Sequence, residues 1–271
     1  MFDNTCKFIA EMYSPDFATW LLGEPITLTK LSPTELSLEP IRADALILLQ
    51  SDEVVLHVEF QTKPDEDMPF RMADYRLRVY RRFPKKRMHQ VVIYLDKTES
   101  EKVYQTTFTA GSLRHEFSVI RLWEQPSEIF LTTPGLLPFA VLSATENKVA
   151  TLQLSAAAVD KIADRRTQSN IAAASAILAG LVLEQEVIAR LFRRDIMRES
   201  VIYQQIKTEG KEEGREEGRE EGREEGSQQK AHEIARNLLA ERMTVDAVAR
   251  ITGLSVEVVQ QLQQGESENQ R

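Results

Sequence analysis

The stretch RADALILLQ (42–50), followed by SD and then EVVLHVEFQ (53–61), decides the fold of this chain. Both runs are rich in apolar and β-branched residues, and Ser51 and Asp52 separate them, which predicts a β-hairpin. Alternate positions give one wholly apolar face, which includes Leu56, Val58 and Phe60. We therefore expect this hairpin to form part of a packed sheet.

The opposite face of the hairpin carries the polar residues. A turn centred between Ser51 and Asp52 places Asp44 directly opposite Glu59, with Cβ atoms about 4.5–5.5 Å apart. Two opposed carboxylates repel each other, and a hard divalent cation such as Mg²⁺ relieves that repulsion through oxygen ligands. The alternative is an edge hairpin whose polar face simply contacts water. His57 shares this face, either as a water or phosphate partner or without a role.

The regions around the hairpin predict an α/β domain over residues 1–145. Residues 2–22 and 67–83 have helical periods, and QVVIYLD (90–96) reads as a strand. FSVIRLW (117–123) and LLPFAVL (136–142) are weaker strand predictions. The order of helix, hairpin, helix and strand indicates a mixed sheet.

Composition limits the classes of function. The chain has 271 residues, a net charge of −8 and one cysteine, Cys6, which excludes a disulfide framework and a multi-cysteine metal site. The longest apolar stretch (171–183) is too short for a bilayer span, which needs roughly 20 residues, and the N-terminus lacks the features of a signal peptide. We expect a cytoplasmic protein without a membrane partner.

Residues 71–87 (RMADYRLRVYRRFPKKR) hold eight basic residues and one acidic residue, which is strong local polarisation in an acidic chain. A helix places Arg71, Tyr75, Arg78 and Arg82 on one face, and such a face would neutralise a DNA backbone. Phe70, Ala73, Leu77 and Tyr80 would then lie nearer the core. The alternatives are a solubilising helix face and a Tyr75 ring that caps the core.

The remainder of the chain reads as helical. Residues 150–206 are rich in alanine and suit a helical layer or an oligomer surface. Residues 207–226 are five tetrads (KTEG, KEEG and three copies of REEG), which suit either a polar linker or a long helix with a glycine stripe. Residues 228–264 resemble a helix-turn-helix, but SVEVVQQLQ has no arginine or lysine, so protein association is favoured over DNA reading.

Several motifs together resemble the Rpn family of recombination-promoting nucleases/putative transposases, within the PD-(D/E)XK nuclease superfamily and its E-x-Q variant. They are Asp44 followed after fourteen residues by Glu59-Phe60-Gln61, FDNTCKF near the start, RADALILL, VVLHVEFQTK, FRMADYRLRVYRR and the Glu/Gly/Lys/Arg tail. This resemblance implies an αβββαβ restriction-endonuclease-like core, followed by the helical region and the charged tail.

The resemblance also implies a function and a site. It implies a Mg²⁺-dependent deoxyribonuclease, with Mn²⁺ able to substitute, in which Asp44, Glu59 and the Phe60 carbonyl hold the metal. Gln61 stands where most of the superfamily has a lysine, and the glutamine can orient water but cannot act as a base. Lys63 is a candidate substitute for that lysine or a solvated strand-end residue, and Asp3 and Lys7 either close the site or form a surface pair.

The expected partners are DNA and further copies of the chain, through the helical region and the tail. The resemblance implies a role in recombination, mobile-element biology or defence. The alternative function is a catalytically inactive nuclease-fold module that binds DNA or protein.

Overall fold

The computed structural model describes residues 2–30, 46–192, 194–197 and 199–269. The described chain divides into two units, Met1–Ile206 and Lys207–Arg271. Within the described residues, no helix is both long and apolar enough to cross a membrane.

The first unit is an α/β domain built on a five-stranded mixed sheet, as predicted. Its strand order is β1-β2-β3-β4-β7, with antiparallel pairing from β1 to β3 and parallel pairing from β3 to β7. The strands are β1 (Thr29–Lys30), β2 (Leu46–Gln50), β3 (Val54–Gln61), β4 (Arg87–Tyr94) and β7 (Ser118–Arg121). A separate hairpin, β5 (Thr107–Ala110) and β6 (Leu113–Glu116), precedes β7.

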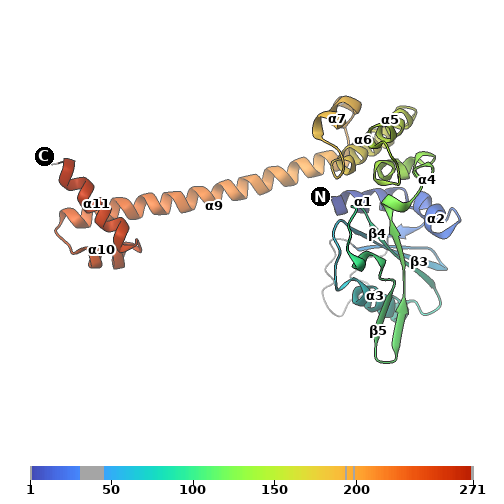
Figure 1. The fold of residues 1–271 in the computed structure, drawn as a ribbon, viewed down its shortest axis with the longest axis horizontal. Helices are drawn as coiled ribbons and strands as arrows, with labels where there is room; N and C mark the ends of the chain where they lie inside the picture. Colours follow the sequence, from blue (N-terminus) through green and yellow to red (C-terminus); the bar gives the residue numbers. More distant parts are fainter. Residues whose placement is uncertain (1, 31–45, 193, 198, 270–271) are drawn as a thin grey trace. The chain divides into compact units, whose positions relative to one another are not determined.

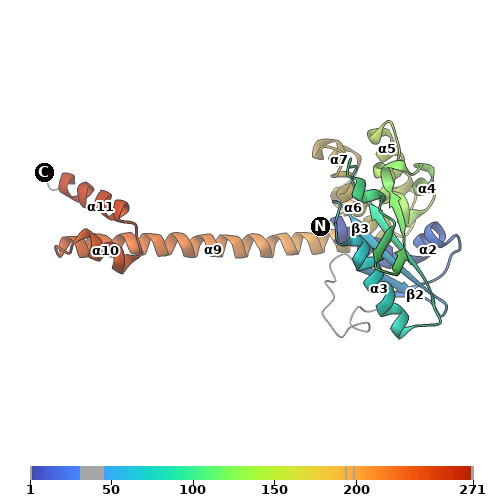
Figure 2. The same cartoon turned by 60° about the horizontal axis from the view of Figure 1, so that its bottom comes forward.

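Helices cover both faces of the sheet (Figures 1 and 2). One face carries α1 (Phe2–Met12), α2 (Ser14–Leu22), the 3-10 helix η4 (Pro134–Leu142), α5 (Lys148–Val159) and α6 (Arg165–Ala179). The other face carries α3 (Met68–Arg82). Shorter elements complete this unit: η2 (Glu101–Tyr104), η3 (Leu122–Glu124), α4 (Glu128–Leu131), α7 (Gln185–Leu191) and α8 (Arg194–Met197).

Strand β3 shows how alternation builds these two layers. Leu56, Val58 and Phe60 pack in the large core with α1, α2 and η4, as the apolar face of the hairpin predicted. Val55 contacts Tyr75 and Val79 of α3 on the other face. The polar face of the hairpin is therefore covered by a helix, and the alternative of an edge hairpin open to water is wrong for β3.

The turn between β2 and β3 lies one residue later than predicted. The Ser51 N–H donates to the Val54 carbonyl at 2.9 Å, and the Ser51 hydroxyl accepts from the Val54 N–H at 3.2 Å. Asp52 and Glu53 are consequently the central turn residues. Leu46, and not Asp44, is the residue paired with Glu59.

Two further predictions needed correction. The helix predicted over residues 2–22 is two helices, because Pro15 lacks an N–H and starts α2 in its first turn. The strand predicted over 136–142 is the buried 3-10 helix η4. A continuous apolar run cannot distinguish a buried strand from a buried helix, and Pro138 cannot donate to a central strand ladder.

The second unit contains most of α9 (Val201–Ala240), with α10 (Val245–Thr252) and α11 (Val256–Asn269). The glycine tetrads lie within α9. A small apolar cluster joins the end of α9 to the two short helices, and its buried members are Ala235, Leu239, Val248, Ala249 and Val259. The predicted helical character of residues 150–206 is also present, in α5 to α8 and the start of α9.

Substitution of Phe60 tests the packing of the large core. The Phe60 ring stacks on Phe139 with ring centroids 5.7 Å apart and contacts the edge of Phe17 at 6.3 Å. We predict that Phe60→Ala lowers the free energy of unfolding by about 3–5 kcal/mol in urea denaturation. Leu154→Ala, at a side chain that is 58% exposed, should change it by less than about 0.5 kcal/mol. Equal effects of the two substitutions would contradict this packing.

Candidate active site

Glu59 is a fully buried carboxylate in the middle of the domain. It lies on β3, on the face covered by α3, and its side chain is 0% exposed. The Nη2 atom of Arg71 lies 2.9 Å from Glu59 Oε2, and His57 Nε2 lies 3.4 Å from Glu59 Oε1. Each carboxylate oxygen therefore has one donor, which a charge removed from water requires.

Gln90 fixes the protonation pattern of His57. The Gln90 amide nitrogen donates to the Met72 carbonyl at 2.7 Å, so this end of the side chain is the NH₂ group. Its second hydrogen is directed to His57 Nδ1 at 3.0 Å, which must therefore accept. The proton of neutral His57 is then on Nε2, and it is donated to Glu59.

Arg71 and Tyr75 bring α3 onto this group. The Arg71 guanidinium bridges Glu59 and Asp65, with Nη1 3.0 Å from Asp65 Oδ2. Burial lowers the pKa of Arg71, but the negative charges of Glu59 and Asp65 outweigh that effect and raise it. The Tyr75 ring contacts His57 edge-on at 5.0 Å. Burial, with the charge of Glu59 added, raises the pKa of its hydroxyl.

Asp3, on α1, is a second acidic residue whose carboxylate interacts electrostatically with Glu59. Its Oδ1 atom is buried and has no hydrogen-bond partner among the described residues. The pKa of Asp3 is raised, first by burial and further by the negative charge of Glu59. A buried carboxylate oxygen without a partner, on a side chain that feels the charge of Glu59, is one that a bound cation would satisfy.

The described residues do not by themselves form a complete metal site. No group of three or more histidine, cysteine or acidic side chains gathers among them in a way that could hold a metal ion. Asp3 and Glu59 therefore give two carboxylates, and further ligands would be main-chain oxygens, waters or Asp44. Mg²⁺ commonly keeps several waters and binds only one or two carboxylates, so this donor set fits it.

The other predicted site residues differ in where they lie relative to Glu59. Asp44 lies outside the described residues. Gln61 ends β3, is half-buried and pairs with Tyr94 of β4. The Phe60 side chain points into the core away from Glu59. Lys63 is exposed and lies beyond the end of β3, so strand alternation does not place it on the Glu59 face. Lys7 lies one turn after Asp3 on α1.

The predicted orientation of α3 is wrong. Tyr75 is 5% exposed and packs in the core, whereas Phe70, Leu77 and Tyr80 are exposed. Arg71 is tied to Glu59, and Arg78 to Asp74 at 2.9 Å. Arg82 is the one residue of the predicted basic face that is exposed. The physical reason is that the buried carboxylate and the row of Met68, Met72 and Val79 decide which side of α3 faces the sheet.

Sequence reasoning missed Gln90, Asp65 and the part played by His57. Gln90 is the polar residue that precedes the apolar run VVIYL of β4. A polar residue buried in a strand needs hydrogen-bond partners, and this need is the signal in the sequence that could have identified Gln90. Their identity depends on the pairing of β3 with β4, which places His57 beside Gln90.

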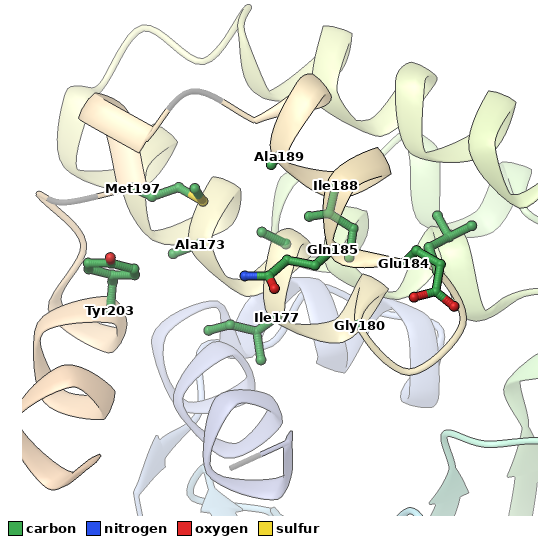
Figure 3. A pocket seen from close by; sticks show the side chains of 11 residues that line it. Ala173, Ile177, Gly180, Glu184, Gln185, Ile188, Ala189, Met197 and Tyr203 are labelled. Carbon is green, nitrogen blue, oxygen red and sulfur yellow. The ribbon is translucent and has the colours of Figure 1, made fainter. Parts of the chain in front are cut away.

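A cavity of about 540 Å³ lies elsewhere, among α6, α7, α8 and the start of α9 (Figure 3). Its lining is mainly apolar, with Ile177, Ile188 and Met197, and includes Glu184, Gln185 and Tyr203. It offers one carboxylate and no histidine or cysteine. The Glu59 cluster is therefore the stronger candidate for chemistry.

The mixed sheet, covered by helices and carrying a buried polar cluster, defines an α/β protein compatible with a nuclease-like core. Residues 228–264 match the family model described as the Rpn/YhgA-like nuclease family, C-terminal HTH domain. This match covers the C-terminal region alone and supports an Rpn family assignment there. No curated protein and no solved structure matches the chain significantly.

The ion pair between Arg71 and Glu59 gives a stability prediction. Arg71→Ala leaves Glu59 buried without its cation, and we expect a loss of about 2–3 kcal/mol of unfolding free energy in urea denaturation. This loss is smaller than for a fully buried pair, because the Arg71 side chain is 28% exposed. Arg166→Ala, at an exposed arginine on α6, is the matched control and should be nearly neutral. Wild-type stability of Arg71→Ala would contradict the proposed dependence of Glu59 on this cation.

Proposed function

We propose that this protein is a metal-dependent DNA endonuclease that hydrolyses phosphodiester bonds. The observation that carries the proposal is the unpartnered, buried Oδ1 of Asp3, a side chain on which the fully buried Glu59 acts electrostatically. Two acidic groups without a shared proton or cation repel each other. The nuclease family of the C-terminal match agrees with this chemistry.

Glu59 and Asp3 would hold the metal from the described part of the chain. Asp44 and the main-chain carbonyl of Phe60 remain proposed ligands from the sequence motif. Mg²⁺ is the proposed ion, with Mn²⁺ as a substitute, because the donors are oxygen atoms. When bound, the metal would activate water and stabilise negative charge on a phosphate.

The protein's own residues hold this arrangement in place. Gln90 fixes the His57 tautomer, and His57 and Arg71 each donate to one oxygen of Glu59. Hydrogen bonds of this kind orient a carboxylate that ligates a metal. Gln61 positions water through hydrogen bonds but brings no charge. Arg71 supplies the positive charge next to Glu59.

The remaining parts of the proposal concern assembly and biological role. We place the protein in the cytoplasm, acting in recombination, mobile-element biology or defence. The helical region and the C-terminal unit would join copies of the chain, so that two sites act on one DNA. Helix α11 carries Glu257, Glu266 and Glu268 and no arginine or lysine, which favours association with protein over contact with phosphate.

One observation favours a second candidate function, an inactive nuclease-fold module. Arg71 already neutralises Glu59 at 2.9 Å, so the cluster has a structural role without metal. In that case DNA or protein binding would persist without cleavage. Metal binding separates the two functions.

Cleavage of supercoiled plasmid tests the proposal. We expect wild-type protein to nick plasmid in Mg²⁺ and in Mn²⁺ but not in EDTA, and we expect Glu59→Gln and Asp44→Ala to abolish nicking. Glu53→Gln is the matched control, because the Glu53 side chain is 82% exposed in the turn before β3. Circular dichroism would verify that each variant is folded. Retained cleavage by Glu59→Gln would refute the site, and no wild-type cleavage would favour the inactive module.

Asp3 gives a separate prediction on stability. Because burial and Glu59 raise the pKa of Asp3, its ionised form costs stability at neutral pH, and that cost disappears as pH falls below this pKa. Asp3→Asn should therefore raise the melting temperature in EDTA at neutral pH and reduce the stabilisation produced by Mg²⁺. Thermal unfolding with and without Mg²⁺ measures both effects. A lower melting temperature in EDTA together with undiminished stabilisation by Mg²⁺ would contradict this assignment.

A further inference from the structure

The outer face of α3 carries large apolar side chains that the domain does not bury. Phe70 is 56% exposed, Leu77 is 55% exposed and Tyr80 is 59% exposed. The core side of the helix is formed by Met68, Met72, Tyr75 and Val79. At 100° per residue, Phe70 and Leu77 lie opposite that row. Phe70, Leu77 and Tyr80 are therefore exposed because of their positions around the helix axis, and not because the end of the helix is frayed.

The β5–β6 hairpin extends this apolar surface. The Phe70 ring contacts Phe108 of β5 with centroids 5.7 Å apart, and Leu113 at the start of β6 is 43% exposed. Figure 1 shows β5 beside α3. A connected exposed apolar surface of this kind marks a binding site more often than scattered single residues do.

The basic residues of 71–87 divide into two groups. Arg71, Arg76, Arg78 and Lys86 are half-buried and bound to partners within the domain, such as the Met88 carbonyl for Arg76 and the Ser51 carbonyl for Lys86. The exposed group comprises Arg81 and Arg82 at the end of α3, Lys85 in the turn that follows, and Arg87, which starts β4 and lies 3.8 Å from Glu53. The apolar face is thus flanked by a positively charged group.

We propose that this outer face of α3 binds single-stranded DNA, with bases stacked on Phe70 and Tyr80 and phosphates held by Arg81 and Lys85. Exposed aromatic rings beside a basic track are the features that bind unpaired strands. In a duplex, the flat faces of the bases are covered by their neighbours and are closed to such rings. The proposal rests on the proposed function in one respect, that DNA is the substrate.

The charge pattern of this face favours DNA. The phosphates of a DNA strand would neutralise this exposed basic group. The face shares a helix with the proposed cleavage site but lies on the other side of that helix. Arg71 contacts Glu59 on the sheet side of α3, whereas Phe70 faces solvent, and Tyr80 lies about 15 Å from Phe70 along the helix axis. A strand on this face is therefore bound outside the candidate site.

Fluorescence anisotropy of the full chain tests the proposal, with a labelled oligothymidylate as the probe. The buffer contains EDTA, so binding is measured without cleavage. We expect tighter binding of the oligothymidylate than of a duplex of equal length. We expect Phe70→Ala/Tyr80→Ala to weaken binding by about tenfold or more. Arg81→Ala/Lys85→Ala should reduce the slope of log affinity against log salt by about 1.

Two matched controls give the result its meaning. Leu154→Ala removes an equally exposed apolar side chain from α5, and Arg166→Ala removes an exposed charge from α6, so both should bind as wild type. Wild-type affinity in Phe70→Ala/Tyr80→Ala, or equal affinity for duplex and single strand, would overturn the proposal. The proposal would also be overturned if wild type is a dimer and Phe70→Ala/Tyr80→Ala is a monomer that still binds DNA. That result would identify the face as a protein interface.

Failure of this proposal and failure of the proposed function give different results. Plasmid nicking without single-strand binding would refute the proposed binding face but not the proposed nuclease function. Single-strand binding that depends on Phe70 and Tyr80, without any nicking, would support the proposed binding face and refute the proposed nuclease function.

Discussion

The Glu59 carboxylate, buried between His57 and Arg71, is the interaction on which the arrangement of the α/β domain depends. A charge with no access to water must be neutralised and hydrogen-bonded. Arg71 does this from α3 and His57 from β3, and Gln90 of β4 holds His57 in the required tautomer. One carboxylate thereby links two strands and a helix. It also accounts for the rotation of α3, which turns Phe70 and Leu77 outward.

Much of this domain can be predicted from sequence because its signals are local. Alternation in VVLHVEFQ identifies both faces of β3, and the helical period over 67–83 identifies α3. Local signals do not determine how elements meet. The Ser51 hydroxyl shifts the hairpin turn by one residue and so changes the partner of Glu59 from the expected Asp44 to Leu46. The run LLPFAVL gives no periodicity from which η4 could be distinguished from a strand.

The candidate site was predicted in part for the same reason. Glu59 stands out because an acidic residue interrupts an apolar strand, but its burial comes from α3, which covers that face of the sheet. Its partners come from residues 71 and 90, which are distant in sequence, and the basic composition of 71–87 pointed to a solvent-facing role for Arg71 instead. A charged side chain in a basic helix has the same sequence signature whether it meets phosphate or a buried carboxylate. The three-dimensional pairing of β3 with β4 and α3 decides between them.

The central claim is that Asp3 and Glu59 share a divalent cation. Calorimetric titration of the full chain with Mn²⁺, at neutral pH and without DNA, tests it most directly. The account predicts saturable binding to wild-type protein, loss of that binding in Glu59→Gln, weaker binding in Asp3→Asn and unchanged binding in Glu53→Gln. Binding of equal strength in wild type and in folded Glu59→Gln, or no binding to either, would contradict it.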